Sequence, residues 1–196
     1  MNEPNESWRL FIAIGLPASV RQKVRQHVER LRDAVPAARA SWTREENLHL
    51  TLKFLGDTPL TKVQELSAAI QLAANAVTSF ELIVADCGAF STRGKPHVLW
   101  IGIQDSSARL NDFYQALESE CVELGFPREE RPFHPHLTIA RLQKTHDSRR
   151  LPEVHREIGF DPVSVPVRDV CLIRSELRSE GSRYTVTSRH AFDSLT

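Results

Sequence analysis

The chain has 196 residues, and its 25 Lys and Arg balance 25 Asp and Glu, so the formal net charge is zero. Hydrophobic residues make up 41% and charged residues 26%, as in an ordinary soluble globular protein and unlike a disordered or fibrous one. A neutral chain has no overall positive field to capture long nucleic acids, so any polyanion must be held locally. This length suits a single domain, and we expect one over residues 1–196.

The sequence also bears on location and redox state. Its first residues, MNEPNESW, are polar and acidic rather than basic and then apolar, and no apolar run approaches the ~18 residues that span a bilayer. Cys87, Cys121 and Cys171 lie far apart and outside any metal-ligand spacing, which argues against a disulfide scaffold or a zinc site. The sequence therefore predicts a cytoplasmic protein with reduced, partly buried thiols, no cofactor and no membrane contact.

The first half of the chain alternates strand and helix patterns. RLFIAIGLP at residues 9–17 is an apolar run ended by Gly and Pro, typical of a buried strand. Residues 18–34 carry an apolar stripe of helical period that includes His27. A second strand pattern, NLHLTLKFLG at 47–56, precedes a helix that we expect to begin at Thr58–Pro59, with Pro in its first turn.

The second half of the chain continues with the same kinds of element. FELIVADCGAF and HVLWIGI predict a hairpin around the polar turn at 91–96. A helix is predicted over 106–124, and the strand pattern FHPHLTIARL at 133–142 follows it. Two β-like runs, 163–177 and 182–192, predict a last hairpin.

In each half, strand material leads into an amphipathic helix and then into a His-Leu-Thr strand, so the sequence is weakly duplicated. Mostly hairpin connections favour antiparallel sheets. We therefore expect an α+β fold of two lobes, each an antiparallel sheet packed with helices. No Pro/Gly/Ser linker separates the halves, so they should pack as one unit.

The His-Leu-Thr triplet occurs twice, at His49–Thr51 and at His136–Thr138. With 8 His, 11 Thr and 21 Leu in the sequence, chance alone gives about 0.05 such triplets. Side chains alternate faces along a strand, so the His and Thr of each triplet share one face and the Leu lies on the other. Each segment thus presents an imidazole and a hydroxyl side by side.

Two imidazoles facing one another suit a reaction that needs one base and one acid, because imidazole titrates near neutral pH. The hydroxyls of Thr51 and Thr138 add donors for oxygens that gain charge. Phosphoryl transfer fits this set, with one imidazole deprotonating water and the other protonating the departing oxygen. His134 with His49 and His136 could suggest a metal site, but no acidic ligand lies at a helpful spacing, so none is predicted.

The sequence resembles the two-histidine (2H) phosphoesterases, specifically the RNA 2′,3′-cyclic phosphodiesterases, also known as 2′-5′ RNA ligases. The resemblance rests on the two HxTx motifs and on RLFIAIGLP, WTREENLHLTLKFLG, GAFSTRGKPHVLWIGI, GFPREERPFHPHLTIAR and RSELRSEGSRYTV, in family order. These segments cover nearly the whole chain. The resemblance implies one bilobal domain with pseudo-twofold symmetry, whose motifs face a central groove.

The resemblance also implies roles in RNA processing. His49 would donate a proton to the leaving ribose oxygen, and His136 would accept one from water. Thr51 and Thr138 would hold the phosphate, and a terminal RNA 2′,3′-cyclic phosphate would open to a 2′-phosphate without a metal. The expected partners are RNA 3′ ends or short oligonucleotides, and we expect a monomer. Two alternatives stay open: 2′-5′ RNA ligation at the same site, and a non-catalytic RNA-end binding module.

Arg141 follows the second motif, five residues after His136, and lies on the opposite face if the strand is regular. The family pattern places an Arg here near the ligand, so we expect a bulge, a twist or the strand end to redirect it toward the phosphate. The alternative is a structural Arg paired with a carboxylate. The basic run at 141–150 is predicted to be a solvated loop that could also guide RNA.

Several other side chains are ambiguous from sequence. Phe11, in an apolar strand, is predicted to be core rather than a platform for the terminal base. Trp100 is expected to pack in the core or between lobes. His27 and His155 belong to no motif and are expected to be solvated or capping.

Overall fold

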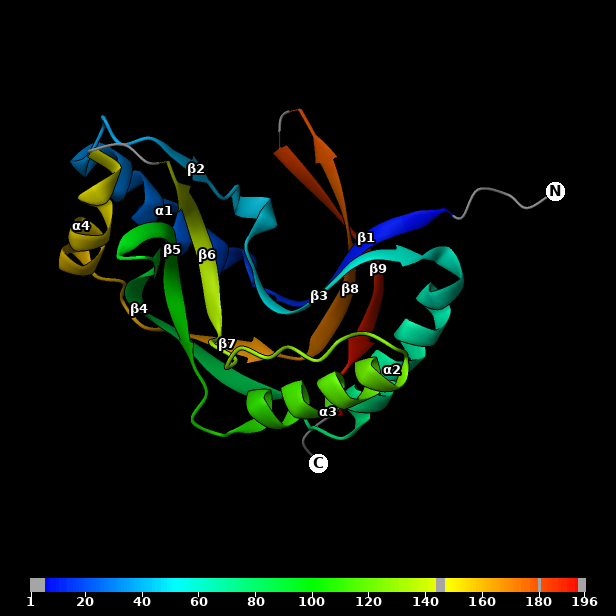
Figure 1. Cartoon of the computed structure of the whole chain (residues 1–196). Helices are drawn as coiled ribbons and strands as arrows, with labels where there is room; N and C mark the ends of the chain where they lie inside the picture. Colours follow the sequence, from blue (N-terminus) through cyan, green and yellow to red (C-terminus); the bar gives the residue numbers. More distant parts are fainter. Residues whose placement is uncertain (1–5, 144–146, 180, 194–196) are drawn as a thin grey trace.

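The structure, a computed structural model, describes residues 6–143, 147–179 and 181–193, which form four α-helices and nine β-strands (Figure 1). In chain order these are β1 (Ser7–Gly15), α1 (Ala18–Ala34), β2 (Ala40–Trp42), β3 (His49–Pro59), α2 (Val63–Asn75), β4 (Phe80–Thr92), β5 (Lys95–Gln104), α3 (Arg109–Glu123), β6 (His136–Leu142), α4 (Leu151–Ile158), β7 (Val163–Val167), β8 (Asp169–Arg178) and β9 (Gly181–Ala191).

The first two helices show what sequence patterns can and cannot locate. The α1 helix has the predicted bounds, and its apolar stripe, His27 included, is buried. The α2 helix begins at Val63 and is directly preceded by a 3₁₀ turn at Leu60–Lys62. Helical structure therefore starts one residue after the predicted Thr58–Pro59, and Pro59 precedes the first turn instead of lying in it. Thr58 pairs with Trp8 in the sheet, and Pro59 has an extended backbone, with ψ of 140°. Pairing with β1 therefore prolongs the strand where Pro alone suggested a helix start.

The C-terminal third differs more from expectation. The run at 163–177 is two strands, because β7 pairs with β4 whereas β8 pairs with β1. Helix α4 was not predicted, and it follows a basic run of which 144–146 lie outside the described residues. The predicted last hairpin is present as β8 and β9, which stand out from the rest of the sheet in Figure 1.

The expectation of two separate sheets is wrong: the strands form one sheet, in the order β7-β4-β5-β6-β3-β1-β8-β9, with β2 paired to β6. The halves join because Leu50 of β3 pairs with Leu137 of β6. The two motif strands therefore lie at the centre, each followed outward by three more strands. The sheet is antiparallel and strongly curled, and the fold is α+β (Figure 1).

The helices cover one face of this sheet, where α1 packs on α4 and α2 on α3. The main hydrophobic core lies there and includes Leu50 and Leu137. A second, smaller apolar cluster of Phe11, Ala13, Cys171 and Ile173 lies apart from it. The three cysteines are free, as predicted, and no helix among the described residues is long and apolar enough to cross a membrane.

Candidate active site

The two motifs come together where β3 meets β6. In an antiparallel pair, opposed residues point to the same face, and their neighbours point to the other. Because Leu50 opposes Leu137 and both are buried in the core, the side chains of His49, Thr51 and His136 share the opposite face, as does that of Thr138. We call this side of the sheet the open face.

Both motif imidazoles are held by the same hydrogen bond. Nδ1 of His49 donates to the carbonyl oxygen of Asn47, and Nδ1 of His136 donates to that of His134, each over 2.7 Å. This bond fixes the ring orientation and leaves Nε2 as the nitrogen available for proton transfer. The Thr51 hydroxyl lies 2.9 Å from Nε2 of His49. Matched carbonyls two residues upstream therefore prepare both rings in the same way.

The electrostatics of the two rings are coupled. Burial lowers the pKa of His49; the Asn47 carbonyl opposes this shift, and the charge of His136 adds to it. Burial also lowers the pKa of His136. The hydrogen bond to the His134 carbonyl opposes this shift, and the positive charges of the His134 ring and of Arg141 add to it. Each positive charge disfavours another, so the pair favours states with fewer than two protons.

A bulge in β6 decides where Arg141 points. Leu99 opposes Ala140 whereas Trp100 opposes Thr138, so Ile139 is an extra residue in the ladder. Ile139 and Ala140 are consecutive and both buried, which reverses the alternation. Arg141 is therefore exposed on the face of Thr138, close enough to affect the pKa of His136.

The first motif has the same bulge, which sequence reasoning missed. Ile12 opposes Lys53 whereas Ala13 opposes Thr51, so the extra residue is Leu52. Lys53 is consequently turned into the protein and is only 5% exposed. Phe54, at the position that Arg141 has in β6, reaches the open face with 72% of its surface exposed.

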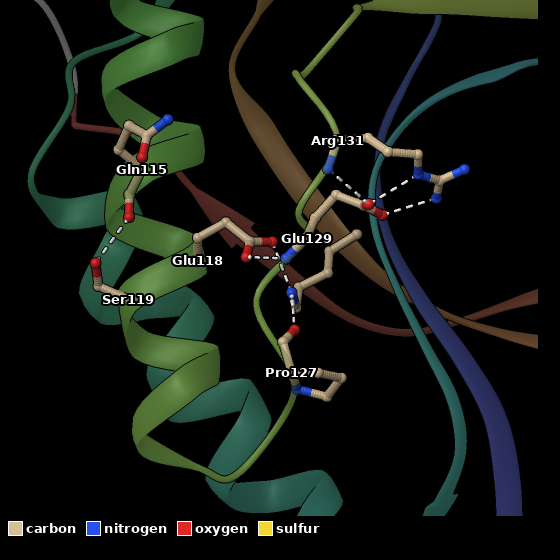
Figure 2. A network of polar contacts seen from close by, with 7 residues as sticks. Gln115, Glu118, Ser119, Pro127, Glu129 and Arg131 are labelled. Carbon is tan, nitrogen blue, oxygen red and sulfur yellow. Dashed lines mark hydrogen bonds and ion pairs between the residues drawn. The ribbon is translucent and has the colours of Figure 1, made fainter.

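The buried Lys53 ties the first motif strand to the segment that precedes the second motif. Its Nζ donates to Glu118 over 2.6 Å and to the Pro127 carbonyl over 2.9 Å. The other carboxylate oxygen of Glu118 accepts from the amide of Glu129 over 3.1 Å (Figure 2). Glu129 in turn holds Arg131 in an exposed ion pair. This network connects β3, α3 and the chain that enters β6.

Aromatic rings surround the first histidine. Phe11 lies 4.9 Å and Tyr184 lies 5.4 Å from the His49 ring, centroid to centroid, and they lie 5.0 Å from each other. Phe11 is buried, as predicted, but beside His49 in the small cluster rather than in the main core. It supports the His49 ring from the open-face side of the sheet.

Aromatic rings also surround the second histidine. Phe90 lies 4.8 Å from the His136 ring, and Trp100 packs against Phe90 and against the exposed His134. Trp100 opposes Thr138 and so lies on the open face, where its indole covers Gly88. The expectation of core or inter-lobe packing for Trp100 is therefore wrong, because pairing with Thr138 turns it to the other side of the sheet.

On the core face, His27 and His155 are fully buried, so the expectation of solvated or capping histidines is wrong for both. Nε2 of His27 lies 2.8 Å from Nδ1 of His155, whose Nε2 donates to the Trp100 carbonyl. With Cys87 they form a group that could hold a metal ion, their ligand atoms lying within 4.8 Å of one another. The two ring nitrogens that face each other, Nε2 of His27 and Nδ1 of His155, already form a hydrogen bond. Both rings lie on the opposite side of the sheet from the two motifs.

A curled antiparallel sheet carrying two His-x-Thr motifs on one face defines an α+β protein of the two-histidine type. The chain belongs to the 2′-5′ RNA ligase superfamily, whose model matches residues 20–178. It is 32% identical to an RNA 2′,3′-cyclic phosphodiesterase of Methanothermobacter thermautotrophicus, over 90% of this chain and 95% of that one. It spans about half, 55%, of a Geobacillus stearothermophilus protein of the same description, at 30% identity over 91% of this chain.

Solved structures agree with this assignment. A protein of Thermus thermophilus superposes with a TM-score of 0.75 at 26% identity, covering 96% of this chain and 100% of that one. Escherichia coli LigT complexed with 3′-AMP gives a TM-score of 0.72 at 28% identity, covering 95% and 99%. The second of these structures holds a ribonucleotide.

Proposed function

We propose that this protein is an RNA 2′,3′-cyclic phosphodiesterase that opens a terminal cyclic phosphate to a 2′-phosphate without a metal. The observation that carries the proposal is the pair of motif imidazoles, each anchored through Nδ1 and both on one face of a single sheet. A single phosphorus atom between them would have a base on one side and an acid on the other. The relatives described as RNA 2′,3′-cyclic phosphodiesterases support the substrate class.

The reaction balances with water as the only co-reactant. Nε2 of His136 removes a proton from water as its oxygen attacks phosphorus, and the bond from phosphorus to the ribose 3′ oxygen breaks. Nε2 of His49 gives a proton to that oxygen, so the product carries a 3′-hydroxyl and a 2′-phosphate. One proton enters the pair and one leaves it, so later exchange with solvent restores the starting state.

The remaining groups would stabilise charge on the phosphate. Thr51 and Thr138 share the face of the imidazoles and can donate to its non-bridging oxygens. Arg141, turned to that face by the bulge, supplies the positive charge and forked donors suited to phosphate. The protein would act as one bilobal domain and a monomer on RNA 3′ ends or short oligonucleotides.

The test is product analysis by phosphorus NMR with a 2′,3′-cyclic nucleotide and EDTA-treated protein. We expect a 2′-phosphate signal, and we expect His49→Ala and His136→Ala each to lower kcat about 10²- to 10⁴-fold. Retained melting temperatures would show that both variants are folded. Full activity in either variant, or a 3′-phosphate product, would contradict the proposal.

Ligation is the second candidate, because the matched superfamily is described as that of the 2′-5′ RNA ligases. In that reaction an RNA 5′-hydroxyl takes the place of water at the same site. RNA halves ending in a cyclic phosphate and a 5′-hydroxyl would give a joined product if it occurs. A non-catalytic RNA-end binder would bind the cyclic end without forming either product.

A further inference from the structure

The open face is asymmetric in its exposed side chains. Three of the exposed large hydrophobic residues of the described chain lie on the His49 side: Phe54 is 72%, Leu177 72% and Val186 48% exposed. On the His136 side, the position that corresponds to Phe54 holds a cationic residue, Arg141. An exposed apolar surface beside a reactive centre is a mark of ligand contact.

The strand register places these residues on one continuous surface. Ile173 belongs to the small open-face cluster and opposes Val186, so Val186 lies on the same face. Tyr184, two residues before Val186, packs against that cluster and lies beside the His49 ring. Alternation along β8 from Ile173 puts Leu177 on this face as well.

We propose that this surface, formed by Phe54, Leu177, Tyr184 and Val186, is a platform for the bases of single-stranded RNA that leads to the cyclic phosphate. The inference rests on the proposed function and names its substrate: an oligonucleotide rather than a mononucleotide or a small cyclic phosphodiester. Bases stack on aromatic and apolar side chains without demanding a sequence. Leu177 lies opposite Ser182, which is four residues before Val186 in β9. The platform therefore extends about 13 Å along β9.

The hairpin that carries the platform is fixed to the active site. The side-chain amide of Asn47 donates to the Ser182 carbonyl over 2.9 Å, and the carbonyl of Asn47 holds His49. The Arg44 guanidinium lies against the hairpin tip at Gly181. Arg183 is also exposed, but it lies on the other face of the hairpin from Tyr184, so Arg44 rather than Arg183 places positive charge near the platform.

Steady-state kinetics on two substrates test the platform: a 2′,3′-cyclic mononucleotide, and a ten-nucleotide RNA ending in a 2′,3′-cyclic phosphate. We expect the wild type to have a lower KM for the RNA. The Leu177→Ser/Val186→Ser variant should raise that KM about five- to tenfold, while the KM for the mononucleotide, which has a single base to stack, should change less than twofold. Leu72→Ser is the matched control, because Leu72 is 59% exposed on α2.

The outcomes separate this inference from the function on which it rests. If the wild type opens neither substrate, the proposed function fails, and fluorescence anisotropy with a 5′-labelled RNA that ends in a 2′,3′-cyclic phosphate still reports whether the double variant weakens binding. Equal KM values for the two substrates, or equal losses in the double variant and Leu72→Ser, would overturn the platform. So would a wild-type dimer in sedimentation that the double variant dissociates, because the surface would then bind a second copy.

Discussion

Phe54 and Arg141 occupy the same position in the two motif strands, each five residues after a motif histidine and just beyond a bulge that turns it to the open face. One is an exposed aromatic ring and the other a cation, so two similar half-sites differ where they meet a substrate. A nucleotide is itself asymmetric, with an apolar base on one side of the ribose phosphate. The pair therefore gives a physical basis for one binding orientation.

Replacing Arg141 tests the cationic half of this arrangement. Arg141→Met should lower kcat/KM about ten- to a hundredfold, because a charge-assisted hydrogen bond to phosphate contributes about 1.5–3 kcal/mol. Arg141→Lys should recover only part of this, since an ammonium cannot make the forked contact. Arg141→Met should also raise the pKa of His136, because the positive charge of Arg141 disfavours the protonated form of that ring. Unchanged kinetics in Arg141→Met would show that Arg141 does not touch the phosphate.

The pH dependence of the reaction should report both imidazoles. Burial lowers the pKa of His49 and of His136, so the optimum of kcat/KM for the free enzyme should lie below pH 6.5. A bound phosphodiester anion stabilises the protonated rings and raises both pKa values. The limbs of the kcat profile should therefore lie at higher pH than those of kcat/KM. Coincident limbs in the two profiles would show that the phosphate does not lie between the rings.

The sequence predicts the candidate site better than its surroundings. The repeated triplet locates both histidines and threonines because period-two alternation depends only on local backbone geometry. The bulges could be anticipated at Arg141 only because its expected role conflicted with that alternation, and nothing similar marked Lys53. The joining of the halves into one sheet depends on the pairing of Leu50 with Leu137, a contact between distant segments that no local pattern encodes.

The ion pair of Lys53 and Glu118 should support catalysis as well as stability. Glu118→Ala leaves a buried ammonium unpaired and should lower the free energy of unfolding by about 3–5 kcal/mol. Lys53→Met/Glu118→Leu removes both charges and should restore most of that stability. The double variant should still lower kcat. Glu129 and Pro127 lie in the segment that enters β6, and in this variant the Glu129 amide loses its bond to Glu118 and the Pro127 carbonyl its bond from Lys53 (Figure 2). Denaturant titration and kinetics on both variants separate the two effects; wild-type kcat in the double variant would limit the pair to stability.

The position of the Trp100 ring should depend on the absence of a side chain at Gly88. A Cβ on Gly88 would lie 2.1 Å from the indole, closer than atoms can approach, so Gly88→Ala must displace the ring. Overpacking of this kind costs about 1–3 kcal/mol, and the shift should change the environment of the His136 side of the site. Gly15→Ala is the control for stability, because its Cβ meets nothing within 4 Å. Thermal unfolding and tryptophan fluorescence would report the change; equal melting temperatures for the two variants would contradict it.

The buried pair of His27 and His155 should make the fold sensitive to acid. Burial, aided by the charges of His155 and Arg30, lowers the pKa of His27 from 6.5 to about 4, and burial also lowers that of His155. Between pH 6.5 and about 4, the unfolded chain binds a proton at His27 that the native state does not. The contribution of the neutral His27 to the free energy of unfolding is therefore fully present above pH 6.5 and is lost as the pH falls toward 4. His27 alone accounts for roughly 3 kcal/mol of this loss. Urea titrations at pH 7.5 and 4.5 measure it, and His27→Leu/His155→Met should flatten the dependence even if it lowers stability at pH 7.5. An equally steep dependence in that variant would assign the acid sensitivity to other groups.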